Sequence, residues 1–147
     1  MSEEKQLMKV VFRDDAGKVE TLWAFDLGEN LYQLDNTPWY QYSVSWKDVI
    51  EAVPESGGEL PLFRRVVEKS GYRTLRVALD EPATDVFLDE IKQLGCLFEG
   101  ANRRYIAIDI PPGIDLRKIA DFLTENDIRW EYADPKYEEV SGERPEL

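Results

Sequence analysis

The chain has 147 residues, of which 43% are hydrophobic and 12% aromatic, and its formal net charge is −12 at pH 7. This length fits one ordinary domain or two small ones that share an interface, and the hydrophobic content excludes global disorder. The acidic balance argues against nucleic acid as a partner, because binding to phosphates requires a basic surface.

The first half of the chain favours short strands that are separated by turns. Two aspartates precede Gly17, and Pro38 follows Asp35, Asn36 and Thr37, so both places have the residue types of turns. We expect strands at residues 10–12, 19–25, 31–34, 49–53 and 60–69. Short strands with turns about every 8–12 residues predict a small SH3-like β-barrel over residues 8–71.

After Gly71 the hydrophobic period changes. Strands are expected at 74–79, 96–98, 105–110 and 128–132, with a helix that starts near Pro82 and another that starts at Asp115 and ends near Asn126. This order, β-α-β-β-α-β, predicts a ferredoxin-like unit over residues 72–133, with both helices on one side of its sheet. The predicted fold class is therefore α+β, with a mobile acidic tail at 134–147.

The predicted sheet has a second face, which is polar. It is expected either to be solvated or to be covered by the barrel. Its side chains are those of Arg76, Tyr105, Ala107, Asp109, Arg129 and Glu131.

Several segments together resemble one bacterial family. They are residues 20–24 (ETLWA), 32–39 (YQLDNTPW), 44–52 (VSWKDVIEA), 64–77, 108–123 and 130–132 (WEY). The family is that of domain of unknown function 4265, and the resemblance extends over nearly all of residues 8–133. The chain has Lys47 where the family pattern leads us to expect a glycine before Asp48. The resemblance implies no established activity; immunity proteins of bacterial toxin systems offer a class-level analogy for such small acidic proteins.

The composition offers no catalytic or cofactor chemistry. The chain contains no histidine, which excludes nucleophile–histidine catalysis and removes the commonest zinc ligand. Its single cysteine, Cys96, excludes an internal disulfide, fits a reducing compartment and is expected to be a buried, inert thiol. The paired carboxylates lie on expected turns, on a helix and in the tail, so we interpret them as solvated surface. We therefore expect no enzyme activity, no cofactor and no metal.

Residues 31–53 hold the most informative group. Exposed tryptophan and tyrosine often anchor a binding site, whereas buried ones would fill the seam between barrel and sheet. The seam is the preferred explanation for Trp46, and the two explanations weigh about equally for Tyr40 and Tyr42. Asp48 lies beside a turn, where capping of the backbone also explains it. The predicted partner-binding residues are Trp39, Tyr40, Tyr42 and Asp48.

Two functions are carried forward. The first is a non-enzymatic acidic protein-binding module for a basic partner, with an immunity-type inhibitor of a basic bacterial toxin as one form of it. The alternative is a small-molecule sensor or binding domain, with its ligand between barrel and sheet near Tyr72, Arg76 and Tyr105. The N-terminus lacks an apolar signal segment, and no apolar run approaches the ~20 residues that cross a bilayer. We therefore expect a cytoplasmic protein with no membrane partner; the oligomeric state stays open.

Overall fold

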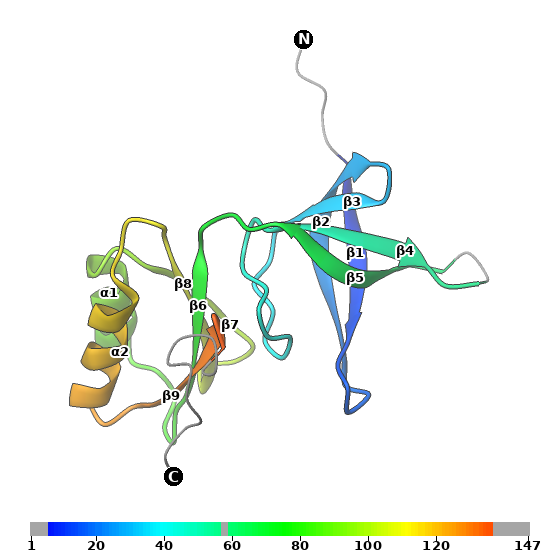
Figure 1. Cartoon of the computed structure of the whole chain (residues 1–147). Coiled ribbons are helices and arrows are strands. Elements are labelled where there is room, and N and C mark those ends of the chain that lie inside the picture. The colour runs from blue at the N-terminus through cyan, green and yellow to red at the C-terminus, as the bar shows by residue number, and fades with distance from the viewer. Residues whose placement is uncertain (1–5, 57–58, 137–147) are drawn as a thin grey trace.

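A computed structural model describes residues 6–56 and 59–136. In these residues, strands β1 to β5 form a closed barrel, and β6 to β9 form a four-stranded sheet in the order β7-β8-β6-β9. Figure 1 shows the barrel on one side of this sheet and both helices on the other. The bounds are β1 (Leu7–Arg13), β2 (Val19–Gly28), β3 (Leu31–Leu34), β4 (Val49–Pro54), β5 (Pro61–Glu68), β6 (Arg73–Ala78), α1 (Asp85–Gln93), β7 (Leu97–Gly100), β8 (Tyr105–Ile110), α2 (Leu116–Glu125) and β9 (Arg129–Asp134).

The fold class expected from the sequence, an α+β protein made of an SH3-like barrel followed by a ferredoxin-like unit, is wrong. The described part of the chain is mostly antiparallel sheet: nine strands lie in two sheets, and the two helices span only nine and ten residues. Hydrophobic periodicity identifies elements one at a time. The architecture depends on which strands pair, and β6 pairs with both β8 and β9, which come much later in the chain.

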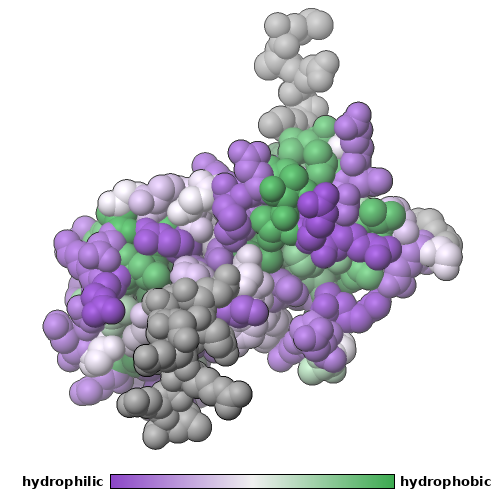
Figure 2. All heavy atoms as spheres, viewed as in Figure 1, coloured by the Kyte–Doolittle hydropathy of each residue, from purple (hydrophilic) through white to green (hydrophobic). Residues whose placement is uncertain are grey.

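The barrel forms because apolar residues alternate along its strands. Val10 and Phe12 of β1 point inward, and Phe12 stacks on Phe63 of β5 with ring centroids 4.6 Å apart. The turn between β1 and β2 is held by Asp14, whose Oδ1 accepts from the N–H groups of residues 16 and 18. Figure 2 shows apolar side chains over the outside of the barrel, among hydrophilic ones. Exposed large apolar side chains on barrel strands include Leu7, Val19, Trp23, Leu27 and Val67.

The helices pack on one face of the second sheet. α1 begins at Asp85, after Thr84, whose Oγ1 accepts from the N–H of Phe87, so the helix starts three residues after the expected Pro82. α2 is capped by Asp115 and ends at Asn126, as the sequence predicted. The core between helices and sheet contains buried residues from both, among them Leu75, Ile91, Ile108, Ile119 and Leu123.

Residues 35–48, which connect β3 to β4, form what we call the docking loop. In Figure 1 this loop is the cyan segment that runs between the barrel and the sheet. It covers the polar face of the sheet, so Thr74 and Arg76 of β6 are 0% and 2% exposed. Of the two alternatives for this face, solvated or covered by the barrel, the second holds at β6, because the loop that covers it connects two barrel strands.

The predicted tail at 134–147 falls largely outside the described residues. Within them, Asp134 is the last residue of β9, and Ala133 forms an isolated bridge with Lys136. Strand β5 ends at Glu68 and β6 begins at Arg73, on either side of the boundary predicted at 71/72. The division into two subdomains stays a prediction.

Candidate functional site

The backbone of the docking loop is held by side chains from the barrel and from the sheet. On the barrel side, the carboxylate of Glu20 accepts from the N–H groups of Trp39, Tyr40 and Gln41 at 2.9, 3.0 and 2.8 Å. On the sheet side, the hydroxyl of Tyr105 donates to the carbonyl of Trp39 at 2.6 Å. Hydrogen bonds to a charged group are stronger than neutral ones, so this segment has a fixed course.

Arg76 holds the same segment from β6, one of the two inner strands of the sheet. Its guanidinium donates to the carbonyls of Pro38, at 3.3 Å, and Gln41. The same group lies 4.9 Å from the ring of Tyr42 and 3.7 Å from the carboxylate of Glu131. The Tyr42 hydroxyl donates to Glu131 at 2.9 Å, and burial, followed by this bond, raises the pKa of Tyr42. The buried arginine therefore fixes both the loop backbone and one of its aromatic side chains.

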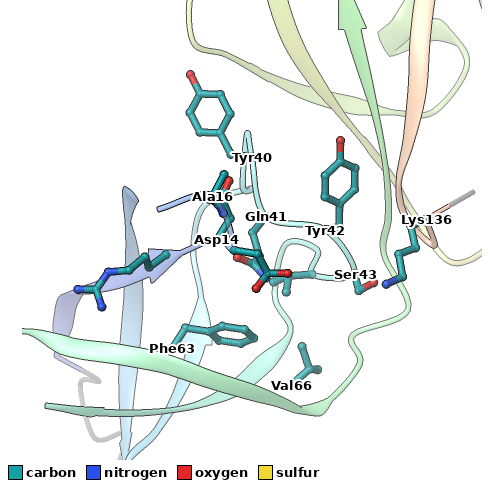
Figure 3. Close-up of a pocket in the computed structure, with 12 residues that line it drawn as sticks. Asp14, Ala16, Tyr40, Gln41, Tyr42, Ser43, Phe63, Val66 and Lys136 are labelled. Atoms are coloured by element: carbon teal, nitrogen blue, oxygen red, sulfur yellow. Dashed lines mark hydrogen bonds between the residues drawn. The ribbon is translucent and has the colours of Figure 1, made fainter. Parts of the chain in front are cut away.

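These contacts place two predicted aromatic residues at an open cavity of about 640 Å³ between the docking loop and the barrel. We call this cavity the loop–barrel groove. In Figure 3, the rings of Tyr40 and Tyr42 project from the loop in the same direction, away from Phe63 and Val66, which lie on the barrel side. The lining residues are Arg13, Asp14, Asp15, Ala16, Tyr40, Gln41, Tyr42, Ser43, Val44, Phe63, Val66 and Lys136. Apolar walls beside a mixture of charged groups suit the binding of a side chain or a short segment of a partner.

The ring of Tyr40 already contacts a cation. The Nζ atom of Lys18 lies 3.8 Å from the ring centroid, close enough for a cation–π interaction. Arg13, also at the groove, forms a 3.2 Å ion pair with Glu55, which offsets part of its charge. The carboxylates of Asp14 and Asp15 lie on the hairpin at the same groove. The residues that line the groove thus include two tyrosines, the carboxylates of Asp14 and Asp15, and the cations of Arg13 and Lys136.

The other predicted residues do not line this groove. Asp48 is fully buried; it accepts from the N–H groups of Ser45 and Ser70 and from Lys69, so its carboxylate is not placed to contact a partner. Tyr72 packs edge-on against Trp46, with ring centroids 5.0 Å apart. Of the residues predicted to bind a small ligand, Arg76 and Tyr105 instead contact the docking loop. The structure therefore brings the two predicted groups together along that loop.

A buried polar network behind the loop was not predicted from the sequence. The ammonium of Lys69 lies 2.5 Å from Asp48 and 2.6 Å from Asp134. The hydroxyl of Ser45 donates to Asp134 at 2.5 Å and lies 2.7 Å from the hydroxyl of Thr74. These residues are far apart in the chain, so no local spacing could have identified the group. Its position between barrel and sheet indicates that it fixes one unit against the other.

A second unpredicted group lies at the start of the loop. Thr37 donates its hydroxyl to Asp109 at 2.5 Å and its N–H to Glu99 at 2.8 Å. Burial, together with the nearby charge of Glu99, raises the pKa of Asp109 to about 7. Burial also raises the pKa of Glu99. The sequence placed Asp109 on the polar face of the sheet but gave no sign of its partners.

The remaining chemistry is limited. Cys96 is buried, and burial raises the pKa of its thiol to about 11, in line with the inert thiol that was predicted. In residues 6–56 and 59–136, no group of three or more histidine, cysteine, aspartate or glutamate residues is arranged to hold a metal. No helix in the same residues has the length and apolar character needed to cross a membrane.

Comparisons with known proteins identify a family and a similar fold. No curated protein matches the chain. A crystal structure of a hypothetical protein from Neisseria gonorrhoeae is similar, with a TM-score of 0.70 and 16% sequence identity over 93% of this chain and 99% of that chain. At this identity the likeness extends to the fold alone. The family described as "Domain of unknown function (DUF4265)" matches residues 20–132. The chain belongs to this family, as its sequence motifs predicted.

Proposed function

We propose that the protein is a non-enzymatic, cytoplasmic binding module that recognises a basic protein partner through the loop–barrel groove. The observation that carries this proposal is the position of Tyr40 and Tyr42 at an open cavity whose lining includes Asp14 and Asp15. Tyrosine is one of the residues in which binding energy concentrates. The net charge of −12 would draw a basic partner towards the protein before contact.

The contact between Lys18 and Tyr40 suggests how a partner would bind. A partner arginine or lysine would take the place of Lys18 over the ring, or lie against Tyr42, with the carboxylates of Asp14 and Asp15 nearby. The backbone of the loop would not need to reorganise, since Glu20 already fixes it. An inhibitor of a basic toxin is one form of this proposal, by analogy of class.

Selection of peptides on the immobilised protein tests the proposal. Peptides chosen from a random library should be enriched in arginine and lysine, and their affinity should fall as salt rises from 50 to ~300 mM, because exposed charges are screened. Tyr40→Ala and Tyr42→Ala should each weaken the binding of a selected peptide about tenfold or more, as expected for an anchoring aromatic. Tyr42→Phe keeps the ring and should bind nearly as the wild type does.

The matched control is Val86→Ala, which truncates an exposed side chain of α1 on the far side of the sheet. Selection of acidic or neutral peptides with equal frequency would contradict the proposal. So would Tyr40 and Tyr42 variants that bind like Val86→Ala. The toxin-inhibitor form has its own test: co-expression should restore the growth of cells that produce a toxin encoded by a neighbouring gene.

The small-molecule alternative stays a second proposal. One observation favours it: the Nε atom of Arg76 is a buried donor without a hydrogen-bond partner among the described residues. A thermal-shift screen with metabolites separates the two functions, because a ligand at a hundred times its Kd stabilises the folded protein by about 2.7 kcal/mol. Large stabilisation by one metabolite, lost in Arg76→Lys, would favour the alternative.

A further inference from the structure

The sheet face under the docking loop carries four carboxyl groups. The strand register places Thr74 of β6 between Asp109 of β8 and Asp134 of β9, and places Arg76 beside Glu131. On β7, Glu99 lies opposite Ala107, which is two residues from Asp109 along β8. Two of the four carboxyls have a cation: Lys69 pairs with Asp134, and Arg76 with Glu131.

The other two carboxyls, Asp109 and Glu99, have no such cation. Within the described residues neither forms a salt bridge. The groups that face them are Thr37, Asn36 and Asp35 of the loop, Thr74 of β6 and the Cys96 thiol before β7. Arg73 of β6 is the nearest cationic residue in strand order, and its guanidinium donates to the carbonyls of Pro111 and Ile114. Asp109 and Glu99 therefore repel each other when both carboxyl groups are ionised.

Thr37 joins the two groups to the loop. Its hydroxyl and its N–H are bonded to Asp109 and Glu99 respectively, and both Thr37 and Asp109 are buried, at 1% and 2% exposure. A buried carboxylate without a cation is costly, so Asp109 is most stable in this place as the neutral acid. Its raised pKa, about 7, agrees with that geometry.

We propose that Asp109 and Glu99 form a proton-operated latch, which keeps the docking loop on the sheet while Asp109 is protonated and releases it more often when both groups are ionised. The loop is the part that moves, because Asp109 lies in a strand that is paired on both sides, between β7 and β6. Thr37 precedes Tyr40 in the same segment, so the latch would regulate the loop–barrel groove. Only this last consequence rests on the proposed function.

The direction of the effect follows from linkage. In the open loop Asp109 is hydrated and has its ordinary pKa near 4, whereas in the closed loop its pKa is about 7. Opening therefore releases a proton between these values, and the opening constant rises about tenfold per pH unit until it levels off above pH ~7. The raised pKa of Glu99 acts in the same direction. The loop should be tightest in mild acid and loosest at neutral pH and above.

Amide hydrogen exchange of the whole protein, followed by NMR from pH 5 to 8 and corrected for intrinsic exchange rates, tests the latch. The protection of the Thr37 amide, whose hydrogen bond to Glu99 is broken when the latch opens, should fall about fiftyfold between pH 5 and 7 and then level off. The amide of Ile108, which lies in the core, should show a smaller change. In Asp109→Asn the Thr37 amide should keep nearly constant protection across this range.

Two further variants keep the test decisive. Glu99→Gln removes the charge that repels Asp109, so the pH above which amide protection stops falling should be lower in this variant. This variant provides the test if Asp109→Asn does not fold. Asp121→Asn removes an exposed carboxylate of α2 and should exchange like the wild type. The latch would be overturned if protection in the wild-type protein did not change with pH. It would also be overturned if Asp109→Asn showed the same pH dependence as the wild type. Where Asp109→Asn does not fold, the same pH dependence in Glu99→Gln and in the wild type would overturn it. No partner is needed in this experiment, so its failure is distinct from a failure of the peptide selection.

Discussion

Lys47 offers a sharp test of the backbone of the docking loop. Its φ is +68°, in the left-handed region, and the family pattern leads us to expect glycine at this position. We compare Lys47→Gly with Lys47→Ala. Both variants remove the same side chain, so both lose the contacts of the Lys47 ammonium with the rings of Trp46, at 4.6 Å, and Tyr72, at 5.8 Å. The difference between them therefore isolates the backbone.

The expected difference in stability between the two variants comes from two contributions. A left-handed residue with a Cβ costs about 1–2 kcal/mol, and glycine removes that cost. The greater freedom of glycine in the unfolded chain returns about 0.4–1 kcal/mol. Lys47→Gly should therefore be more stable than Lys47→Ala by about 0.5–1 kcal/mol. The lost cation–π contacts, worth about 0.5–1 kcal/mol at an exposed site, lower both variants relative to the wild type.

Urea unfolding followed by tryptophan fluorescence measures this difference. With an m-value of about 2 kcal/mol/M, the midpoint of Lys47→Gly should lie about 0.3–0.5 M above that of Lys47→Ala, with equal slopes. The melting temperature should differ by about 2–3 °C in the same direction. If Lys47→Ala is as stable as Lys47→Gly or more so, residue 47 is not left-handed in solution, and the described loop conformation is wrong at this turn.

Three further predictions concern the buried carboxylates and the buried thiol. Lys69→Met leaves Asp48 and Asp134 without their shared cation and should lower the free energy of unfolding by about 3 kcal/mol in urea titrations; a loss below about 1 kcal/mol would contradict the network. Asp109 has a folded-state pKa above its unfolded value, so its stabilisation is complete below pH ~4 and is lost as the pH rises to about 7. Across this pH range, the free energy of unfolding of Asp109→Asn should therefore rise by up to about 4 kcal/mol relative to that of the wild type. Free energies of unfolding that change with pH in parallel in the two proteins would refute this prediction. Cys96 should react with a thiol reagent at pH 8 at least about a hundredfold more slowly in the folded than in the urea-unfolded protein; equal rates would show that the thiol is accessible.

Local chemistry could be predicted from the sequence where a residue acts on its own neighbours. Asp115 caps α2 and Asn126 ends it, and Gly95, which follows the C-cap residue of the first helix, has a φ of +91°. The first helix shows the limit of such rules. Pro82 suggested its start, but the oxygen of Thr84 accepts the free N–H of the first turn and fixes the start instead.

The long-range partnerships could not be predicted, because they join distant parts of the chain. Thr37 and Asp109 are 72 positions apart, and Lys69 and Asp134 are 65 apart. Strand periodicity did place Arg76, Tyr105 and Asp109 on one polar face. It could not show that the docking loop covers that face, since a loop has no period to match against a sheet. For the same reason, the sequence offered Asp48 as a binding residue although its surroundings bury it.

Residues 39–41 are hydrogen-bonded to both the barrel and the sheet, and this limits how the protein can be divided into fragments. The barrel supplies the acceptor for three amides of residues 39–41 through Glu20, while the sheet supplies donors to the neighbouring carbonyls through Arg76 and Tyr105. A fragment cut after Gly71 would retain the amide partner and lose every one of these carbonyl partners. Neither half is therefore a transferable module, and we expect both to melt together in one cooperative step.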